Sequence, residues 1–227
     1  MPSKTINKTG YSLLKNHKIF YKIQGNGRRL MIITGTNSDT RHEPTIYDAP
    51  GSSKFELLNF DHRGMGQSTA PSQDPTMEGY ADDIAMLLDN LGWENTAVMG
   101  VSFGGMVAQH FALRHTKRVR KLALCCTSSG GIGGSSYPLQ TLQDLSAVEY
   151  ASTIMKLMNV KHTDQWQAEH PARAKRTYEY YWQGANATFN NPDKHAAMKK
   201  QFSARAEHNV YEDLKHLNIP TLVACGQ

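Results

Sequence analysis

Residues 96–112, TAVMGVSFGGMVAQHFA, decide the fold of this chain because they predict a buried strand, a sharp turn and a helix in direct succession. The first four residues form a short apolar run, which is typical of a parallel strand covered on both faces. Gly100, Ser102 and Gly104 then spell G-x-S-x-G, a turn in which the serine takes a strained backbone conformation. Glycine is needed at both positions because the chain there passes too close to neighbouring backbone to carry a Cβ. The pattern predicts that the Ser102 hydroxyl stands clear of the sheet.

The helix that follows adds an electrostatic feature to this serine. The first amides of a helix are unpaired and carry partial positive charge, so the Phe103 amide should face the place where an oxyanion would form if Ser102 attacked a carbonyl. A lone G-x-S-x-G is a weak signal, but a strand before it and a helix after it make it specific. A glycine-rich turn with an incidental serine is the alternative.

Composition and charge restrict the class of protein. With 227 residues, 39% of them hydrophobic, the chain is long enough for one sizeable core and an inserted subdomain, and it is expected to be a soluble globular protein. The net charge of +5 is mild. The densest basic cluster, residues 114–121, falls where a helix should end and where positive charge is favourable. We therefore expect a helix-end role for this cluster and no nucleic-acid partner.

The cysteines and the apolar runs bear on compartment and cofactors. Cys125, Cys126 and Cys225 match no metal-ligand spacing and cannot form a full disulfide framework, so we predict small buried thiols in a reducing compartment. The N-terminus has no apolar stretch of signal-peptide length, and nowhere do eighteen apolar residues run together. We therefore expect a cytoplasmic protein with no membrane partner.

The rest of the first half alternates between strands and helices. Residues 11–23 predict two short antiparallel strands at a sheet edge, and residues 30–33, 55–60 and 121–126 predict buried strands. Residues 80–91 predict an amphipathic helix that ends at Gly92. Asp61 and Arg63, after the strand over 55–60, predict a tight turn with an ion pair and a scaffolding role. This alternation implies a parallel sheet with right-handed crossovers.

The composition and the secondary-structure pattern of the sequence change after residue 128, and this change predicts the domain organisation. A run rich in glycine and serine precedes about seventy residues of helical sequence without strand runs. We assign residues 1–130 to an α/β core, 131–208 to a helical cap, and 209–227 to a return to the core with a helix over 210–217 and a strand over 221–224. One aromatic group in the cap should mostly form its core, with some members able to face a pocket: Trp166, Tyr178, Tyr180, Tyr181 and Trp182.

Three segments together resemble the α/β-hydrolase family, in the branch of compact esterases, enol-lactone hydrolases, C-C bond hydrolases and cofactor-free haloperoxidases. They are NFDHRGMGQS (59–68), YADDIAMLLDNLG (80–92) and AVMGVSFGGMVAQHFALRHTKRVRKLAL (97–124). The end of the chain, LKHLNIPTLVACGQ (214–227), resembles the penultimate core strand of that family. The resemblance implies a mostly parallel sheet with helices on both faces and an inserted helical cap, lacking the final strand and helix.

The resemblance also implies roles for particular residues. Ser102 is the nucleophile, the Phe103 amide is one donor of the oxyanion hole, and the Thr36 amide, in the loop after the strand over 30–33, is the other. The family usually has His-Gly in that loop, where this chain has Thr34-Gly35. The implied activity is that of a serine hydrolase whose small-molecule substrate is an ester, lactone or related carbonyl compound and which acts through an acyl-enzyme. The resemblance implies no metal or organic cofactor.

A serine hydroxyl needs a base to take its proton, and the base needs an acid to orient it. In the family the chain order is serine, acid, histidine, and the resemblance places the last two beyond Gln227. His110 lies about 12 Å along the helix from Ser102, which is too far. Three other histidines could approach the serine, and Asp144 is a conceivable acid: His42, His62 and His208.

Several functions remain open on this basis. The chain could be a truncated hydrolase with impaired activity, or a non-catalytic ligand-binding protein that needs no base. Cofactor-free perhydrolysis and C-C cleavage would use the same serine. Haloalkane dehalogenation is disfavoured because it needs a carboxylate where the chain has Ser102. A sheet that ends on the strand over 221–224 would leave an unpaired edge, so we expect the chain to pair with a second copy through that edge or to aggregate.

Overall fold

The computed structural model describes residues 8–41, 43, 45–134 and 136–226. The chain divides into two compact units. The first comprises Met1–Pro138 and Lys200–Gln227, and the second comprises Leu139–Lys199. Each unit is described by itself below.

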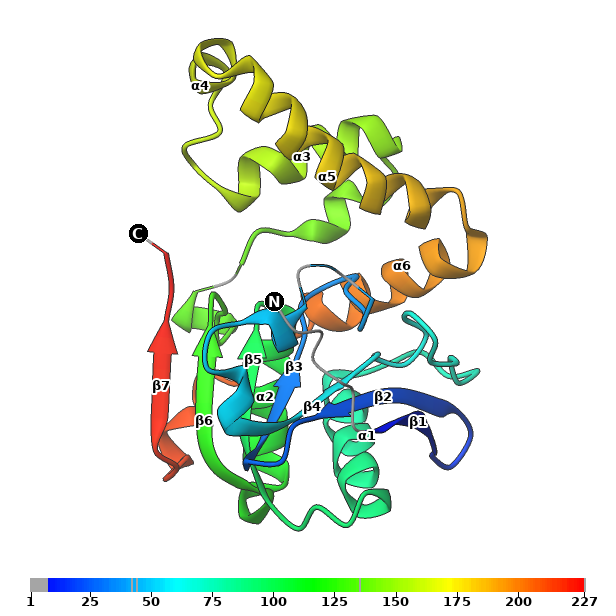
Figure 1. Cartoon of the computed structure of the whole chain (residues 1–227), viewed down its shortest axis with the longest axis vertical. Helices are drawn as coiled ribbons and strands as arrows, with labels where there is room; N and C mark the ends of the chain where they lie inside the picture. The colour runs from blue at the N-terminus through cyan, green and yellow to red at the C-terminus, as the bar shows by residue number, and fades with distance from the viewer. Residues whose placement is uncertain (1–7, 42, 44, 135, 227) are drawn as a thin grey trace. The chain divides into compact units, whose positions relative to one another are not determined.

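The first unit is built on a seven-stranded sheet (Figure 1). In spatial order the strands are β1 (Lys8–Leu13), β2 (Lys18–Gln24), β4 (Phe55–Phe60), β3 (Arg28–Ile33), β5 (Thr96–Val101), β6 (Val119–Cys125) and β7 (Thr221–Ala224). β2 runs antiparallel to both β1 and β4, whereas the five strands β4, β3, β5, β6 and β7 are mutually parallel. The predicted mostly parallel sheet with an antiparallel edge pair is confirmed.

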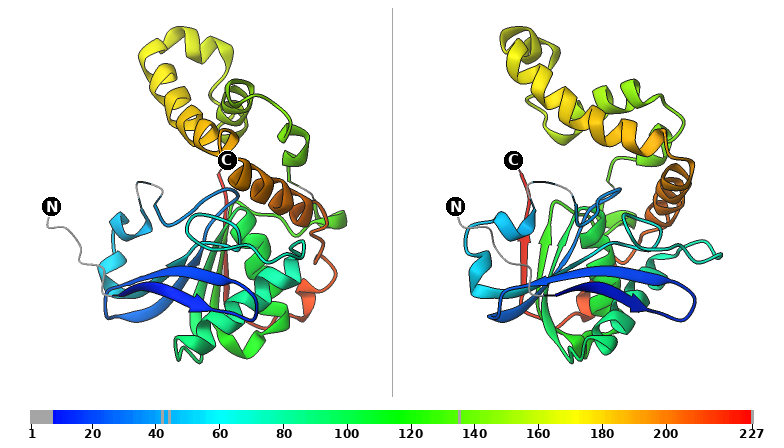
Figure 2. Two further views of the ribbon diagram at one scale, coloured as in Figure 1. Left: turned by 90° about the vertical axis from the view of Figure 1, so that its right-hand side faces the viewer. Right: turned by 45° about the vertical axis from the view of Figure 1, so that its right-hand side comes forward.

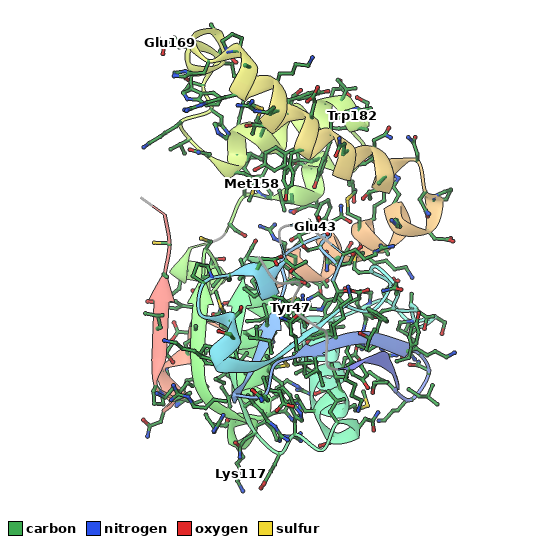
Figure 3. All side chains as sticks on the ribbon, viewed as in Figure 1. Glu43, Tyr47, Lys117, Met158, Glu169 and Trp182 are labelled. Atoms are coloured by element: carbon green, nitrogen blue, oxygen red, sulfur yellow. The ribbon has the colours of Figure 1, made fainter. Side chains whose placement is uncertain are left out.

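Apolar side chains of the central strands cover both faces of this sheet, because successive side chains along a strand point to opposite faces. Met31, Ile33, Leu58 and Val98 enter one core, which α1 (Met77–Asn90) and α2 (Phe103–Arg114) cover. On the other face, Ile32 packs with Leu57 and Tyr47, and the short helices η1 (Ile46–Asp48) and η2 (Ser52–Lys54) lie over them. Figure 2 (left) shows these helices on opposite sides of the sheet, and Figure 3 labels Tyr47.

The helix ends follow capping chemistry. α1 begins one turn earlier than the sequence predicts, because the Thr76 hydroxyl accepts a hydrogen bond from the Gly79 amide at 3.0 Å. Gly92 follows the helix with φ of 66°, the left-handed conformation expected there. α2 ends at Arg114, as expected for the start of the basic cluster, and η3 (Thr116–Arg118) follows it. Arg114 pairs with Asp82 on α1 at 2.8 Å.

Two local predictions for the first unit are wrong. Residues 210–217 form only the short helix η6 (Leu214–His216), preceded by a turn in which the Val210 carbonyl accepts from the Asp213 and Leu214 amides at 3.0 and 3.1 Å. Cys126 and Cys225 are exposed rather than buried, since they follow the last residues of β6 and β7. Cys125, the last residue of β6, is partly exposed.

The second unit is helical, with η5 (Leu139–Leu142), α3 (Ala147–Met158), α4 (Asp164–Glu169), α5 (Pro171–Phe189) and the start of α6 (Pro192–Ala206). α3 begins with a capping box in which Ser146 and Glu149 exchange hydrogen bonds, and it packs along α5 (Figure 1). The buried side chains of these two helices are mainly small or flexible ones: Tyr150, Ala151, Met155, Ala174, Ala185 and Thr188.

The aromatic group therefore does not form the core of this unit as expected. Tyr180 is exposed, and Trp166, Tyr178, Tyr181 and Trp182 are only partly buried. Figure 3 labels Trp182 on α5 and Met158 at the end of α3. A ring contact between α3 and α5 instead uses other aromatic residues, since the rings of Tyr150 and Phe189 lie 5.2 Å apart.

The boundaries between the units fall at 138/139 and 199/200, inside the segment that the sequence assigns to the cap. Hydrogen bonds account for this position. Gly130 pairs with Asn209 in an isolated bridge, and the Arg205 guanidinium donates to the Tyr137 carbonyl at 2.8 Å. These bonds hold residues on both sides of η4 (Gly131–Gly133) within the first unit. Across the described residues, no helix has the length and apolar character needed to cross a membrane.

Candidate active site

Ser102 stands between the end of β5 and the start of α2 with φ of 54° and ψ of −119°. Few residues other than glycine take such a positive φ, and the conformation persists only where its surroundings enforce it. Here the Ser102 amide donates to the Cys125 carbonyl at 2.9 Å, and the Ser102 carbonyl accepts from the Gly105 amide and the Thr127 hydroxyl. The strained turn that the sequence predicts is therefore present, and it is held from three sides.

The two glycines of the motif are sterically required, as predicted. A Cβ built on Gly100 would lie 2.7 Å from the Gly105 Cα and 2.8 Å from the Ala108 Cβ. A Cβ built on Gly104 would collide with the Ile33 carbonyl at the end of β3. Close approach of α2 to β5 and β3 is what places the serine at the carboxyl edge of the sheet.

The loop after β3 lies directly against Ser102. A Cβ built on Gly35 would be 3.5 Å from the Ser102 Cβ, so the peptide groups on either side of Gly35 adjoin the serine. Thr36 follows in this loop, and Phe103 opens α2. Within the described part of the chain the Phe103 amide has no hydrogen-bond acceptor. This arrangement brings the elements that carry Thr36 and Phe103 to the serine.

His62 packs among aromatic side chains next to Thr34 and makes no contact with the Ser102 hydroxyl. The imidazole is 1% exposed and packs edge-on against Phe60, Tyr80 and Phe103. Its Nε2 lies 3.3 Å from the Thr34 carbonyl, to which it donates as the neutral ring. Burial lowers the pKa of His62 to about 4, so the ring is uncharged at neutral pH.

His208 pairs with His110 instead of Ser102. Its Nε2 donates to the Ser128 carbonyl at 2.9 Å, and its Nδ1 lies 3.1 Å from the His110 Nε2. The other nitrogen of His110 lies 3.6 Å from the Glu78 carboxylate. Burial lowers the pKa of both imidazoles, that of His110 to about 4. Both nitrogens of His208 are thus engaged away from the serine.

Two candidates for base and acid remain, His42 and Asp144. His42 falls outside the described residues. Asp144 belongs to the second unit, where it pairs with Lys199 at 2.7 Å. Among the residues that the structure describes, no imidazole or carboxylate lies within hydrogen-bonding distance of the Ser102 hydroxyl. The same residues contain no cluster of three or more His, Cys, Asp or Glu side chains that could hold a metal ion.

The predicted ion pair between Asp61 and Arg63 is wrong. The Arg63 guanidinium forms two 2.6 Å hydrogen bonds with the carboxylate of Asp83 on α1. Asp61 is buried and accepts from the Thr40 and Gln67 amides at 2.6 and 2.8 Å. Burial raises the pKa of Asp61, and these two amides oppose that shift. The scaffolding role expected for both residues fits these contacts.

Asp83 and Gln201 carry contacts that the sequence reasoning missed. Asp83 falls on the apolar face of α1, between Tyr80 and Leu87, and a buried acid at such a position signals a cationic partner. Gln201, near the end of α6, is fully buried, and its Oε1 accepts from the Asn37 amide at 2.7 Å. No sequence signal pointed to Gln201, because its partner is 164 residues away.

The chain belongs to the α/β hydrolase fold family, whose pattern matches residues 34–227. Solved structures with the same fold include the enol-lactonase from Burkholderia xenovorans LB400, with a TM-score of 0.69 and 21% identity, covering 94% of this chain and 80% of that one. A hydrolase from Pseudomonas aeruginosa PA01 superposes with a TM-score of 0.75 and 23% identity, covering 98% and 81%.

Among curated relatives, the chain is 28% identical over 186 residues to RutD of Caulobacter sp. (strain K31), which its name describes as a candidate carbamate hydrolase. The match covers 77% of this chain and 63% of that protein. It is 38% identical over 78 residues to a poly(3-hydroxyalkanoate) depolymerase of Ectopseudomonas oleovorans, covering 34% and 28%. The chain thus spans less than two thirds of the length of these relatives.

Proposed function

We propose that this chain supplies the nucleophile and the oxyanion hole of a serine hydrolase. Ser102 is the nucleophile, and the amides of Phe103 and Thr36 are the oxyanion donors. The observation that carries the proposal is the strained backbone of Ser102 between two sterically required glycines. Strain of this kind costs free energy, and it is typical of functional sites. Its position at the carboxyl edge of a parallel sheet is where α/β proteins bind ligands.

The chemistry is acyl transfer to the serine. The Ser102 Oγ bonds to the carbonyl carbon of the substrate, the C=O π electrons move to the oxygen, and the two amides stabilise the negative charge that develops there. A base removes the Oγ proton, which leaves with the alcohol when the oxyanion collapses to the acyl-enzyme. Water then releases the acid. A small ester, lactone or related carbonyl compound fits this sequence, and the names of the relatives are those of enzymes for carbamates, polyesters and enol-lactones.

One observation favours a second candidate, a non-catalytic ligand-binding protein. No described histidine or carboxylate contacts the Ser102 hydroxyl, and a serine without a base is a poor nucleophile. Loss of the triad base lowers turnover by roughly 10⁶-fold in serine hydrolases, which leaves binding and the oxyanion hole.

A fluorophosphonate probe distinguishes the two candidates. We expect it to label the wild-type chain at Ser102, as located by peptide mass spectrometry, and to leave Ser102→Ala unlabelled. Ser152→Ala is the matched control, because Ser152 is exposed on α3 and should not affect labelling. A folded wild-type chain that stays unlabelled would support the ligand-binding alternative and contradict an activated nucleophile.

A further inference from the structure

Three buried polar atoms, on Gln201 and on the two residues that flank Gly35, have no hydrogen-bond partner in the described part of the chain. They are the side-chain oxygens of Thr34 and Thr36 and the Nε2 of Gln201. Buried polar groups are nearly always paired, and each one left unpaired destabilises the fold. Three such atoms in one place point to an occupant that supplies the missing partners.

Gln201 is the most informative of the three. Its side chain is fully buried, and its Oε1 accepts from the Asn37 amide at 2.7 Å. This bond fixes the amide group beside the loop and leaves the two N–H bonds of Nε2 unused. One half of the Gln201 amide thus holds the loop in position, and the other half is a donor without an acceptor.

The same loop adjoins the serine. Gly35 separates the two threonines, and a Cβ built on it would lie 3.5 Å from the Ser102 Cβ. The unpaired hydroxyls therefore flank the residue that contacts the serine, and Gln201 is bonded to the next residue after Thr36. A ligand whose carbonyl carbon reaches Ser102 therefore has this loop beside it, and an oxygen a few bonds from that carbon is the part that can contact these groups.

All three groups can donate a hydrogen bond, and none carries a charge. A neutral acceptor suits them, whereas an unpaired carboxylate buried among them would keep a large desolvation cost. A keto oxygen is neutral and accepts two hydrogen bonds, so it satisfies two of the three groups. A hydroxyl accepts two and also donates one to a threonine oxygen, so it satisfies all three. An interior water molecule is the competing occupant, since buried waters commonly satisfy such groups.

We propose that Gln201 Nε2, with the hydroxyls of Thr34 and Thr36, binds a second oxygen of the substrate, a keto or hydroxyl oxygen a few bonds from the scissile carbonyl. This inference rests on the proposed function and names its substrate class, acyl compounds with an oxo or hydroxy group on the acyl chain. Gln201 is a specificity residue here, because it contacts the part of the substrate that does not react.

The test measures binding rather than turnover, so it does not depend on an activated serine. The Ser102→Ala form of the full chain, labelled with ¹⁵N, is titrated with methyl 3-oxobutanoate and with methyl butanoate, which differ only in that the first has a keto group at C3 where the second has a methylene. We expect the side-chain amide signals of Gln201 to shift with the oxo ester only. The oxo ester should bind at least about fivefold tighter, which corresponds to about 1 kcal/mol.

Two variants separate the donor role of Gln201 from its role in holding the loop. Gln201→Glu keeps an acceptor for the Asn37 amide but removes the donor, and Gln201→Met removes both. Both variants should lose the preference for the oxo ester and bind methyl butanoate as before. Retention of the preference in Gln201→Glu would overturn the proposal.

Three results of the titration alone would also overturn it, even if neither variant folds. They are equal affinity for the two esters, binding of neither up to its solubility limit, and a long-lived water detected at the Gln201 amide in the complex. The fluorophosphonate experiment fails or succeeds independently of all three, since labelling needs the Ser102 hydroxyl and this titration omits it.

Discussion

Gly104 illustrates how tightly single residues determine this site. A Cβ at this position would meet the Ile33 carbonyl and lie 2.5 Å from the Thr34 carbonyl, both on the strand and loop that adjoin Ser102. Neither backbone group can move without shifting β3 or the loop. The absence of one methyl group therefore allows α2 to approach the sheet closely enough to present the serine.

We expect Gly104→Ala to destabilise the chain by about 2–3 kcal/mol, because overpacking against backbone forces the helix away from the strand. Urea denaturation followed by circular dichroism measures the change. Gly184→Ala is the matched control, since Gly184 lies within α5 and a Cβ there would meet nothing within 4 Å. The control should be neutral or stabilising by up to about 1 kcal/mol. Equal effects of the two substitutions would contradict the steric argument.

His62 makes stability depend on pH. Its pKa in the folded chain, about 4, lies below the usual value of 6.5, so the unfolded chain binds more protons between these values. Stability should therefore fall as the pH drops from about 6.5 to about 4, by at most about 3 kcal/mol from this residue. In His62→Phe, thermal unfolding between these pH values should show a smaller slope. His110, whose pKa is also about 4, and His208, whose pKa burial also lowers, would contribute to the slope that remains.

At the scale of secondary structure, α1 is anchored through one buried charge. Asp83 accepts from the Arg63 guanidinium at 2.6 Å and lies 3.1 Å from the His17 Nε2. Its neighbour Asp82 makes a similar pair with Arg114, but on the surface. Because water screens an exposed pair and not a buried one, the two adjacent aspartates should differ in their contribution to stability.

Asp83→Asn should destabilise the chain by roughly 3 kcal/mol, since it leaves the partly buried Arg63 guanidinium without its carboxylate. Asp82→Asn, the control one residue away on the same helix, should cost at most about 1 kcal/mol. Chemical denaturation at neutral pH measures both. A similar cost for the two variants would show that burial does not decide the contribution of this pair.

On the scale of the whole molecule, β7 forms one edge of the sheet, and its apolar side chains face solvent. Leu222 is 62% exposed and Val223 is 70% exposed. An apolar edge strand with unpaired backbone groups is a template for pairing with another chain. β1 forms the opposite edge, where Leu13 is also exposed, but charged residues flank this strand.

We therefore expect the 227-residue chain to self-associate through β7 as its concentration rises. Leu222→Lys should shift the sedimentation coefficient toward that of a monomer, because lysines on an edge strand oppose pairing. Leu13→Lys on β1 is the control and should leave association unchanged. A wild-type chain that sediments as a monomer at every concentration would contradict this prediction.

Local pattern determined much of the fold. The apolar runs that became β3, β4 and β5, the helix that ends at Gly92, and the strained turn at Ser102 all depend on residues close together in the chain. Short-range sterics dictate such features. The glycines required at positions 100 and 104 can be recognised directly in the sequence, as part of the G-x-S-x-G motif. Strand and helix alternation then implied the parallel sheet.

Only the tertiary structure decided the partners of the polar side chains. Arg63 bonds to Asp83 and not to Asp61, His208 bonds to His110, and Gln201 reaches Asn37 from 164 residues away. The exposure of Cys126 and Cys225 likewise follows from their position past the ends of their strands. A hydrogen bond requires its donor and acceptor to be placed to within a few tenths of an ångström of each other's preferred separation. Folding brings such groups together from distant parts of the chain, and no spacing along the sequence encodes their positions.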